Sequence, residues 1–153
     1  MRDVEIAKHF IKATVTILST MASLEAQPGK PFPKKDMKAL GDISAIIGVT
    51  GVKNGTISVS FSRESATALV EGMLGDAVED LEQDMQDAVG EVANMISGQA
   101  RASIAEAGVT LQGSTPSVVV GDDHQILHMN KAPVIAIPFS TPGGEFTIEF
   151  CLA

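Results

Sequence analysis

The segment LEQDMQDAVGEVANMISGQARASIAEAG, from Leu81 to Gly108, has the pattern of one long amphipathic helix that ends at a glycine. At about 100° per residue, one narrow arc collects Met85, Ala88, Val89, Val92, Ile96 and Ser103. A stripe of this width is typical of a helix that packs against a sheet. The segment therefore predicts a helix laid on a sheet, and the rest of the chain must supply that sheet.

The opposite face of this helix carries polar residues and glycines: Asp87, Gly90, Glu91, Asn94, Gly98 and Arg101. Glu91 and Asn94 are three residues apart, so their side chains lie on neighbouring turns and point the same way. A glycine lies four residues to each side of Asn94, and glycine in an exposed helix costs about 0.8–1 kcal/mol relative to alanine. Close approach of a partner to Asn94 would explain both glycines; neutral drift on a solvated face is the alternative.

Length, composition and charge restrict the classes of function open to the chain. Its 153 residues fit one domain, 1–153, and 44% of them are hydrophobic. A net charge of −8 opposes binding to nucleic acid or to anionic lipid. No stretch approaches the roughly 18 apolar residues of a membrane span, and the first ten residues do not have the pattern of a signal peptide. We therefore expect a cytoplasmic domain with no nucleic-acid or membrane partner.

The remaining segments supply a second helix and two hairpins. Residues 3–22 have an amphipathic helical pattern, and the proline- and lysine-rich residues 23–42 indicate an irregular, solvated connection. Asn54-Gly55 predicts a hairpin over residues 43–61, and Ser62 is a typical N-cap for a helix over residues 63–74 closed by Gly75. Beyond the long helix we expect strands at Ser117–Val120, Gln125–Met129, Val134–Phe139 and Glu145–Leu152.

The last hairpin repeats the pattern of the first at a constant offset of 89 residues. Gly144 corresponds to Gly55, and Phe146, Ile148 and Phe150 correspond to Ile57, Val59 and Phe61. Chance similarity between two amphipathic hairpins is the alternative to a true repeat. The whole pattern predicts an α/β fold of the α+β type: a sandwich with a largely antiparallel sheet, two long helices on one face and a pseudo-two-fold repeat.

Most side chains that could carry chemistry form no recognisable site. His124 and His128 are four residues apart in an expected strand or turn, where that spacing does not bring both rings to one metal. They are expected to be surface or strand-end residues, and His9 has no companion on its helix. Cys151, the single cysteine, alternates with core residues and has no identifiable base, which indicates an inert, partly buried thiol. The sequence therefore predicts no metal site.

The polar face of the long helix remains as the candidate site. Asn94 has no pKa that would let it abstract a proton, but its carboxamide can accept one hydrogen bond and donate another. It can therefore hold a water in line with an electrophilic phosphorus, as the water-orienting glutamine of GTPases does. This chemistry suits a phosphoryl group on a second protein, to which the projecting helix brings the amide.

Four residues in fixed spacing carry a resemblance to a known family. Asp87, Glu91, Asn94 and Pro116 fit the D/S-x3-E-x2-N-x21-P pattern of the CheC, CheX and FliY phosphatases of bacterial chemotaxis. The stretches GEVANMISGQA and PVIAIPFS resemble the CheX branch, and the likeness covers nearly the whole chain. CheC-type members carry a second E-x-x-N on the first helix, which here has no asparagine. One site per chain is therefore expected, on a CheC-like fold.

The resemblance implies hydrolysis of the aspartyl phosphate on a CheY-type response regulator. Asn94 would orient the water, and Glu91 would pair with a lysine of the partner. From their place on the same face of the helix, we also expect Asp87, Gly90, Gly98 and Arg101 to contact the partner. Mg²⁺ would belong to the partner's active site, so the chain would need no cofactor of its own. A homodimer joined through the sheets is also implied, with the last strand, around Phe150 and Leu152, as its candidate edge. Pro116 is expected to shape the entry to a strand.

Two other classes of function stay open. A non-catalytic adaptor could bind a receiver domain or a flagellar-switch component through the same helix. Such a binder would not need the Asn94 amide, so the amide favours the enzyme. The flanking glycines and the four-residue spacing argue against a structural domain with a merely solvated face.

Overall fold

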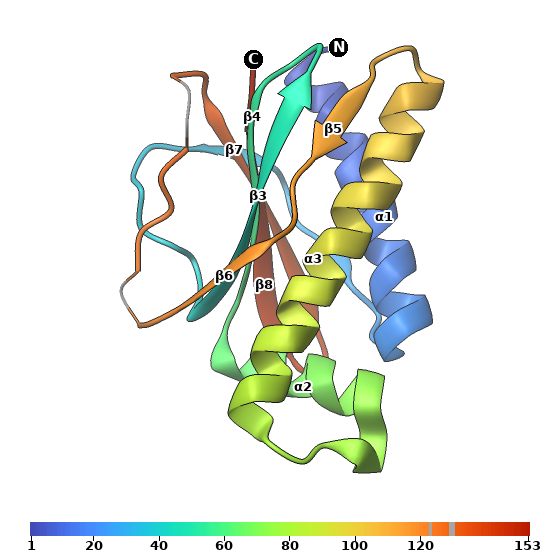
Figure 1. The fold of residues 1–153 in the computed structure, drawn as a ribbon, viewed down its shortest axis with the longest axis vertical. Helices are drawn as coiled ribbons and strands as arrows, with labels where there is room; N and C mark the ends of the chain where they lie inside the picture. The colour runs from blue at the N-terminus through green and yellow to red at the C-terminus, as the bar shows by residue number, and fades with distance from the viewer. Residues whose placement is uncertain (123, 129–130) are drawn as a thin grey trace.

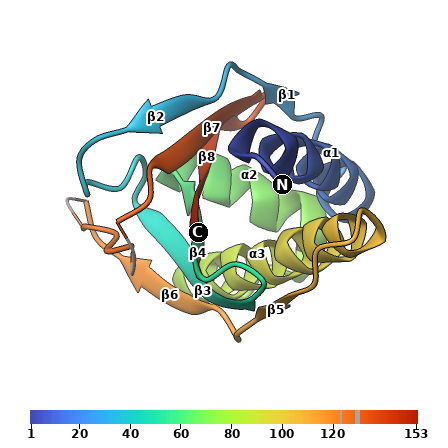
Figure 2. The same ribbon diagram turned by 90° about the horizontal axis from the view of Figure 1, so that it is seen from above.

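The computed structural model of the chain describes residues 1–122, 124–128 and 131–153. Within these residues, three α-helices lie on one face of a sheet: α1 (Asp3–Ala22), α2 (Arg63–Leu74) and α3 (Leu81–Glu106) (Figure 1 and Figure 2). A short 3-10 helix, η1 (Gly75–Ala77), follows α2. The strands are β1 (Gln27–Pro28), β2 (Phe32–Lys34), β3 (Ile43–Gly51), β4 (Gly55–Phe61), β5 (Leu111–Gly113), β6 (Ser117–Val120), β7 (Val134–Thr141) and β8 (Gly144–Leu152).

The helices begin and end where the local sequence signals predict. α1 and α2 match the expected ranges, and α3 ends two residues before Gly108. The Ser62 hydroxyl accepts a hydrogen bond from the Ser65 amide at 3.0 Å, which satisfies one free N–H at the start of α2. Gly75 closes α2 with φ of 56°, a positive value that favours glycine.

The sheet is antiparallel throughout and has the predicted internal symmetry. Its strand order is β1-β7-β8-β4-β3-β5, while β2 also pairs with β7 and β6 with β3. In the central pair Ile57 lies opposite Phe150, and Phe61 lies opposite Phe146. The repeat equates Ile57 with Phe146 and Phe61 with Phe150, so a two-fold rotation converts one pair into the other. The pseudo-two-fold repeat is therefore confirmed.

The last strand is not an edge, and that prediction is wrong. β8 pairs with β4 on one side and with β7 on the other along almost its whole length. Phe150, Cys151 and Leu152 are all buried, because both faces of β8 are covered. A strand that is apolar on both faces is typical of the interior of a sheet, whereas edge strands are short or interrupted.

Two connections differ from the sequence-based expectation. The strand predicted at Gln125–Met129 is reduced to one isolated bridge between Lys38 and Gln125, and Met129 lies outside the described residues. Conversely, the connection at 23–42 contains β1 and β2, and a third strand that was not expected, β5, follows α3. Pro28 and Pro33 are tolerated in these strands because they lie at the margin of the sheet. No further strand lies beyond them to require the backbone N–H that proline lacks.

The core between helices and sheet is built around phenylalanine rings. Phe10 of α1 stacks on Phe150 of β8 with ring centroids 5.6 Å apart. Phe61 and Phe139 lie on either side of Phe146, at 4.7 and 5.0 Å. Each fully buried phenylalanine contributes about 1.5–3 kcal/mol of hydrophobic free energy. The Phe10–Phe150 stack attaches α1 to the centre of the sheet, and the other two stacks join β4, β7 and β8 to one another.

The other face of the sheet is polar but covered. Its buried polar side chains include Ser44, Thr56, Ser58, Ser60, Thr147 and Glu149. His124 contacts the Ser44 hydroxyl at 2.6 Å, and His128 contacts Glu149 at 3.2 Å, while Lys34 lies 3.5 Å from the same carboxylate. The prediction of surface histidines is therefore wrong for these two rings, which hold residues 124–128 against the sheet. Cys151 was expected to be partly buried and is fully buried.

Candidate functional site

The candidate site lies on α3, whose rotation is fixed by its buried stripe. Val89, Val92, Ala93 and Ile96 are fully buried against the sheet. The Asp80 side chain caps the helix by accepting a hydrogen bond from the Gln83 amide at 3.3 Å. A rigid helix thus presents its opposite face to solvent, as the periodicity predicted.

Glu91 and Asn94 are both exposed on that face. Within the described chain, neither side chain takes part in a hydrogen bond or an ion pair, so both are free to contact a second molecule. Asp87 is exposed one turn earlier, and its carboxylate accepts a hydrogen bond from Gln83 Nε2 at 2.9 Å. The three residues therefore form a row of polar groups on consecutive turns of one helix.

A shallow hollow of about 350 Å³ adjoins this row where the end of α2 approaches α3. Its lining combines apolar side chains with carboxylates: Met73, Leu74, Asp84, Asp87, Ala88 and Glu91. Asn94 lies beyond its rim. The hollow therefore flanks the Glu91 end of the row.

The two glycines beside Asn94 have different surroundings. A Cβ on Gly90 would lie 3.2 Å from Cγ2 of Val118 in β6, so close packing within the chain accounts for this glycine. A Cβ on Gly98 would meet only the Arg101 guanidinium, at 4.0 Å. Gly98 therefore leaves open space on the outer face, one turn from Asn94.

Arg101 lies on the same face but is only half-exposed. Its Nε donates a hydrogen bond to the Ser97 hydroxyl at 3.1 Å, and its guanidinium lies against Gly113 of β5. Pro116 immediately precedes β6, in the position expected of a residue that shapes the entry to a strand. In Figure 1, β5 and β6 run beside α3, so this margin of the sheet supports the outer face of the helix.

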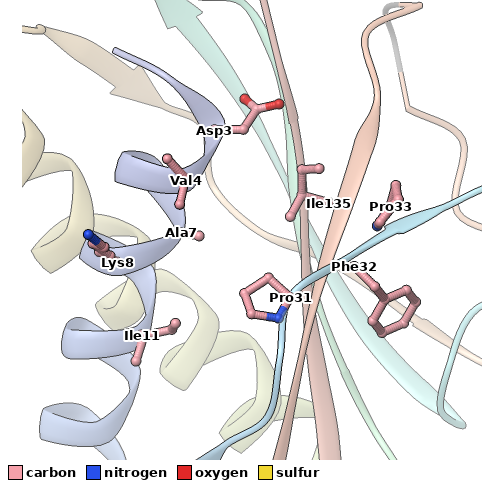
Figure 3. A pocket seen from close by; sticks show the side chains of 9 residues that line it. All are labelled: Asp3, Val4, Ala7, Lys8, Ile11, Pro31, Phe32, Pro33 and Ile135. Carbon is pink, nitrogen blue, oxygen red and sulfur yellow. The ribbon is translucent and has the colours of Figure 1, made fainter.

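A second hollow, at the far margin of the sheet, involves none of these residues. It measures about 380 Å³, lies between α1 and β2, and has an almost entirely apolar lining (Figure 3). Its apolar lining residues include Val4 and Ile11 of α1, Pro31 and Ile135. Across the described ranges, no three potential ligands gather as a metal site would require, and no helix has the length and apolar character needed to cross a membrane.

Comparison with known proteins assigns the chain to a family. The family described as chemotaxis phosphatase CheX matches residues 43–140. The chain belongs to this family. The CheX crystal structure from Desulfovibrio desulfuricans is 59% identical, covers 97% of this chain and 99% of its own, and superposes with a TM-score of 0.92. The resemblance, the CheC-like fold and the prediction of a phosphatase are therefore confirmed.

Two more distant members carry functional descriptions of their own. The CheY-P phosphatase CheX of Thermotoga maritima is 27% identical over 125 residues, which is 81% of each chain. The CheX in a CheX–CheY–BeF3–Mg²⁺ complex from Borrelia burgdorferi is 23% identical, covers 95% of this chain and 96% of its own, and has a TM-score of 0.77. At that identity the Borrelia structure shows a common fold.

Proposed function

We propose that this CheX-family chain hydrolyses the aspartyl phosphate of a CheY-type response regulator through Asn94 and Glu91. The observation that carries the proposal is the pair of exposed side chains without partners, one turn apart, on the outer face of a rigid helix. The description of the Thermotoga relative as a CheY-P phosphatase supports the same substrate. Residues 1–153 would act as one phosphatase domain in the cytoplasm.

Asn94 would act by position and not by proton transfer. Its carbonyl oxygen accepts a hydrogen bond from the attacking water, and this fixes the water opposite the bond between phosphorus and the aspartyl oxygen. The water oxygen bonds to phosphorus as that bond breaks, and the electron pair leaves with the aspartate carboxylate. Both protons of the water end on the released inorganic phosphate. This reaction needs no general base on α3.

Glu91 would set the register of the helix in the complex. The Cα of Glu91 lies about 4.5 Å along the helix axis from the Cα of Asn94. A lysine beside the regulator's phosphoryl group can therefore reach the Glu91 carboxylate when Asn94 faces the phosphorus. A charge-assisted hydrogen bond of this kind fixes position as well as affinity. Mg²⁺, which is part of the Borrelia complex, would be held by the regulator and not by this chain.

The test is the decay of phosphorylated CheY from the same organism in the presence of each variant. Wild type should accelerate the decay, and Asn94→Ala should lower kcat by about 100-fold or more because the water loses its orientation. Glu91→Ala should chiefly raise KM. Matched controls on the same helix are Gln99→Ala, which removes an exposed carboxamide elsewhere, and Glu106→Ala, which removes an exposed carboxylate.

The alternatives give different results in this experiment. A wild-type chain that binds the regulator without changing its decay is an adaptor, and the catalytic proposal then fails. Loss of activity in Gln99→Ala equal to that in Asn94→Ala would show that the Asn94 effect is not specific. A chain that neither binds phosphorylated CheY nor accelerates its decay contradicts the proposed function.

A further inference from the structure

Arg101 is an isolated positive charge in an acidic part of the chain. It is the only lysine or arginine between Arg63 and Lys131, an interval that contains twelve aspartates and glutamates. In the part of the chain that the structure describes, no carboxylate of α3 or its neighbours forms an ion pair with it. Its charge is therefore available to a second molecule.

Contacts with Ser97 and Gly113 fix the position of the Arg101 guanidinium, whereas a typical surface arginine is mobile. Its Nε donates to the hydroxyl of Ser97, a residue with 0% exposure, so a buried polar group holds it in place. A Cβ on Gly113 would lie 2.7 Å from Nε and 2.8 Å from Cζ. The absence of a side chain at Gly113 thus creates the space that the guanidinium occupies.

The same contacts place the guanidinium on the outer face of α3, one turn beyond Asn94. A helical side chain covers the turn N-terminal to its own Cα, and Nη2 of Arg101 is the atom that a Cβ on Gly98 would meet. The guanidinium therefore lies beside Gly98, whose Cα is about 6 Å along the helix axis from the Cα of Asn94. Glu91 lies on the other side of Asn94. The outer face of α3 thus presents an anion, a carboxamide and a cation in that order.

We propose that Arg101 is a second docking residue, which binds a carboxylate of the response regulator while Glu91 binds its lysine. The proposal rests on the proposed function and adds the direction in which α3 docks. A regulator surface with a lysine opposite Glu91 and a carboxylate opposite Arg101 can bind α3 in only one orientation. The two terminal nitrogens of a guanidinium match the geometry of a carboxylate. The Ser97 and Gly113 contacts hold them a full turn from Asn94, away from the phosphoryl group that its water attacks.

The experiment separates KM from kcat in the same CheY assay. Arg101→Ala should raise KM by about 10-fold, the loss expected for a docked charge pair worth roughly 1.4 kcal/mol, and leave kcat within about two-fold. Arg101→Glu should raise KM further by repulsion, and Arg101→Lys should fall between wild type and Arg101→Ala. Gly113→Ala keeps the charge but displaces the guanidinium, so it should raise KM as Arg101→Ala does.

Arg63→Ala is the matched control, because it removes one exposed arginine whose partner, Glu82, belongs to the chain itself. An equal rise of KM in Arg63→Ala and Arg101→Ala would overturn the proposal in favour of a general charge effect. A fall in kcat with unchanged KM, or no change in either, would also overturn it. Circular dichroism of each variant excludes misfolding as the cause.

Failure of the proposed function is recognised separately. If wild type binds phosphorylated CheY without hydrolysing it, Arg101 is tested by the Kd of the same variants, with the same expected order. If wild type does not bind CheY at all, the docking proposal falls together with the proposed function.

Discussion

Lys34 has a structural role on the face of the sheet opposite the helices. Its ammonium group lies 3.5 Å from Glu149 Oε2 and donates to the Asp36 carbonyl at 3.1 Å. The Glu149 side chain is fully buried, beside His128. A buried carboxylate is costly unless it is paired, so this cluster ties β2 and residues 124–128 to β8.

At the residue scale, we expect Lys34→Met to destabilise the fold by about 3–5 kcal/mol, because it leaves a buried carboxylate without its cation. Urea denaturation followed by circular dichroism measures the change. Lys35→Met removes an exposed lysine next in the chain and should stay within about 0.5 kcal/mol of wild type. Equal effects of the two substitutions would mean that Glu149 does not depend on Lys34.

At the scale of elements, the helices meet through glycines as well as through apolar stripes. Gly72 in α2 faces the end of α1, where an added Cβ would lie 2.0 Å from the Ala22 carbonyl oxygen. Gly98 in α3 faces open space apart from Arg101. The same substitution should therefore have opposite effects on stability at these two positions.

Gly72→Ala should lower the free energy of unfolding by about 1–3 kcal/mol, because α1 and α2 must move apart. Gly98→Ala should raise it by about 0.5–1 kcal/mol through helix propensity. If Gly98 serves close approach of the regulator, Gly98→Ala should also raise KM in the CheY assay. Thermal denaturation and the assay test both statements; a destabilised Gly98→Ala or a stable Gly72→Ala would contradict the packing described above.

At the scale of the whole molecule, the sheet has a protected centre and two margins. β4 and β8 have strand neighbours on both sides, whereas β1 and β2 form one margin and β5 and β6 the other. We propose that the homodimer implied by the CheX resemblance joins two sheets through a margin and leaves β8 in the interior of each chain. Open strand edges offer unpaired backbone groups for such an association.

Solution scattering at micromolar concentration should therefore give twice the chain mass of 16.0 kDa. Hydrogen exchange should show slow amides in β4 and β8 at every concentration, because they open only with global unfolding. Amides of one margin should become protected as concentration rises. A monomeric mass, or concentration-dependent protection confined to β8, would argue against this arrangement.

The sequence by itself determined the features that depend on near neighbours. The faces of α3 follow from a 3.6-residue period, the ends of α2 follow from Ser62 and Gly75, and the first hairpin follows from Asn54-Gly55. The spacing of Glu91 and Asn94 belongs to this class as well, because one helical turn fixes it whatever the rest of the chain does. That is why the candidate site and its family could be recognised before the fold.

Only the tertiary structure decided the features that join distant segments. Three such features depend on contacts between different elements: the interior position of β8, the pairing of buried Glu149 with Lys34, and the packing of the Arg101 guanidinium against Gly113. No local pattern marks Gly113 as a neighbour of Arg101, and prolines concealed the short strands β1 and β2. Strand order and side-chain partners arise from packing across the whole chain, whereas helix faces and turns arise from the backbone geometry of adjacent residues.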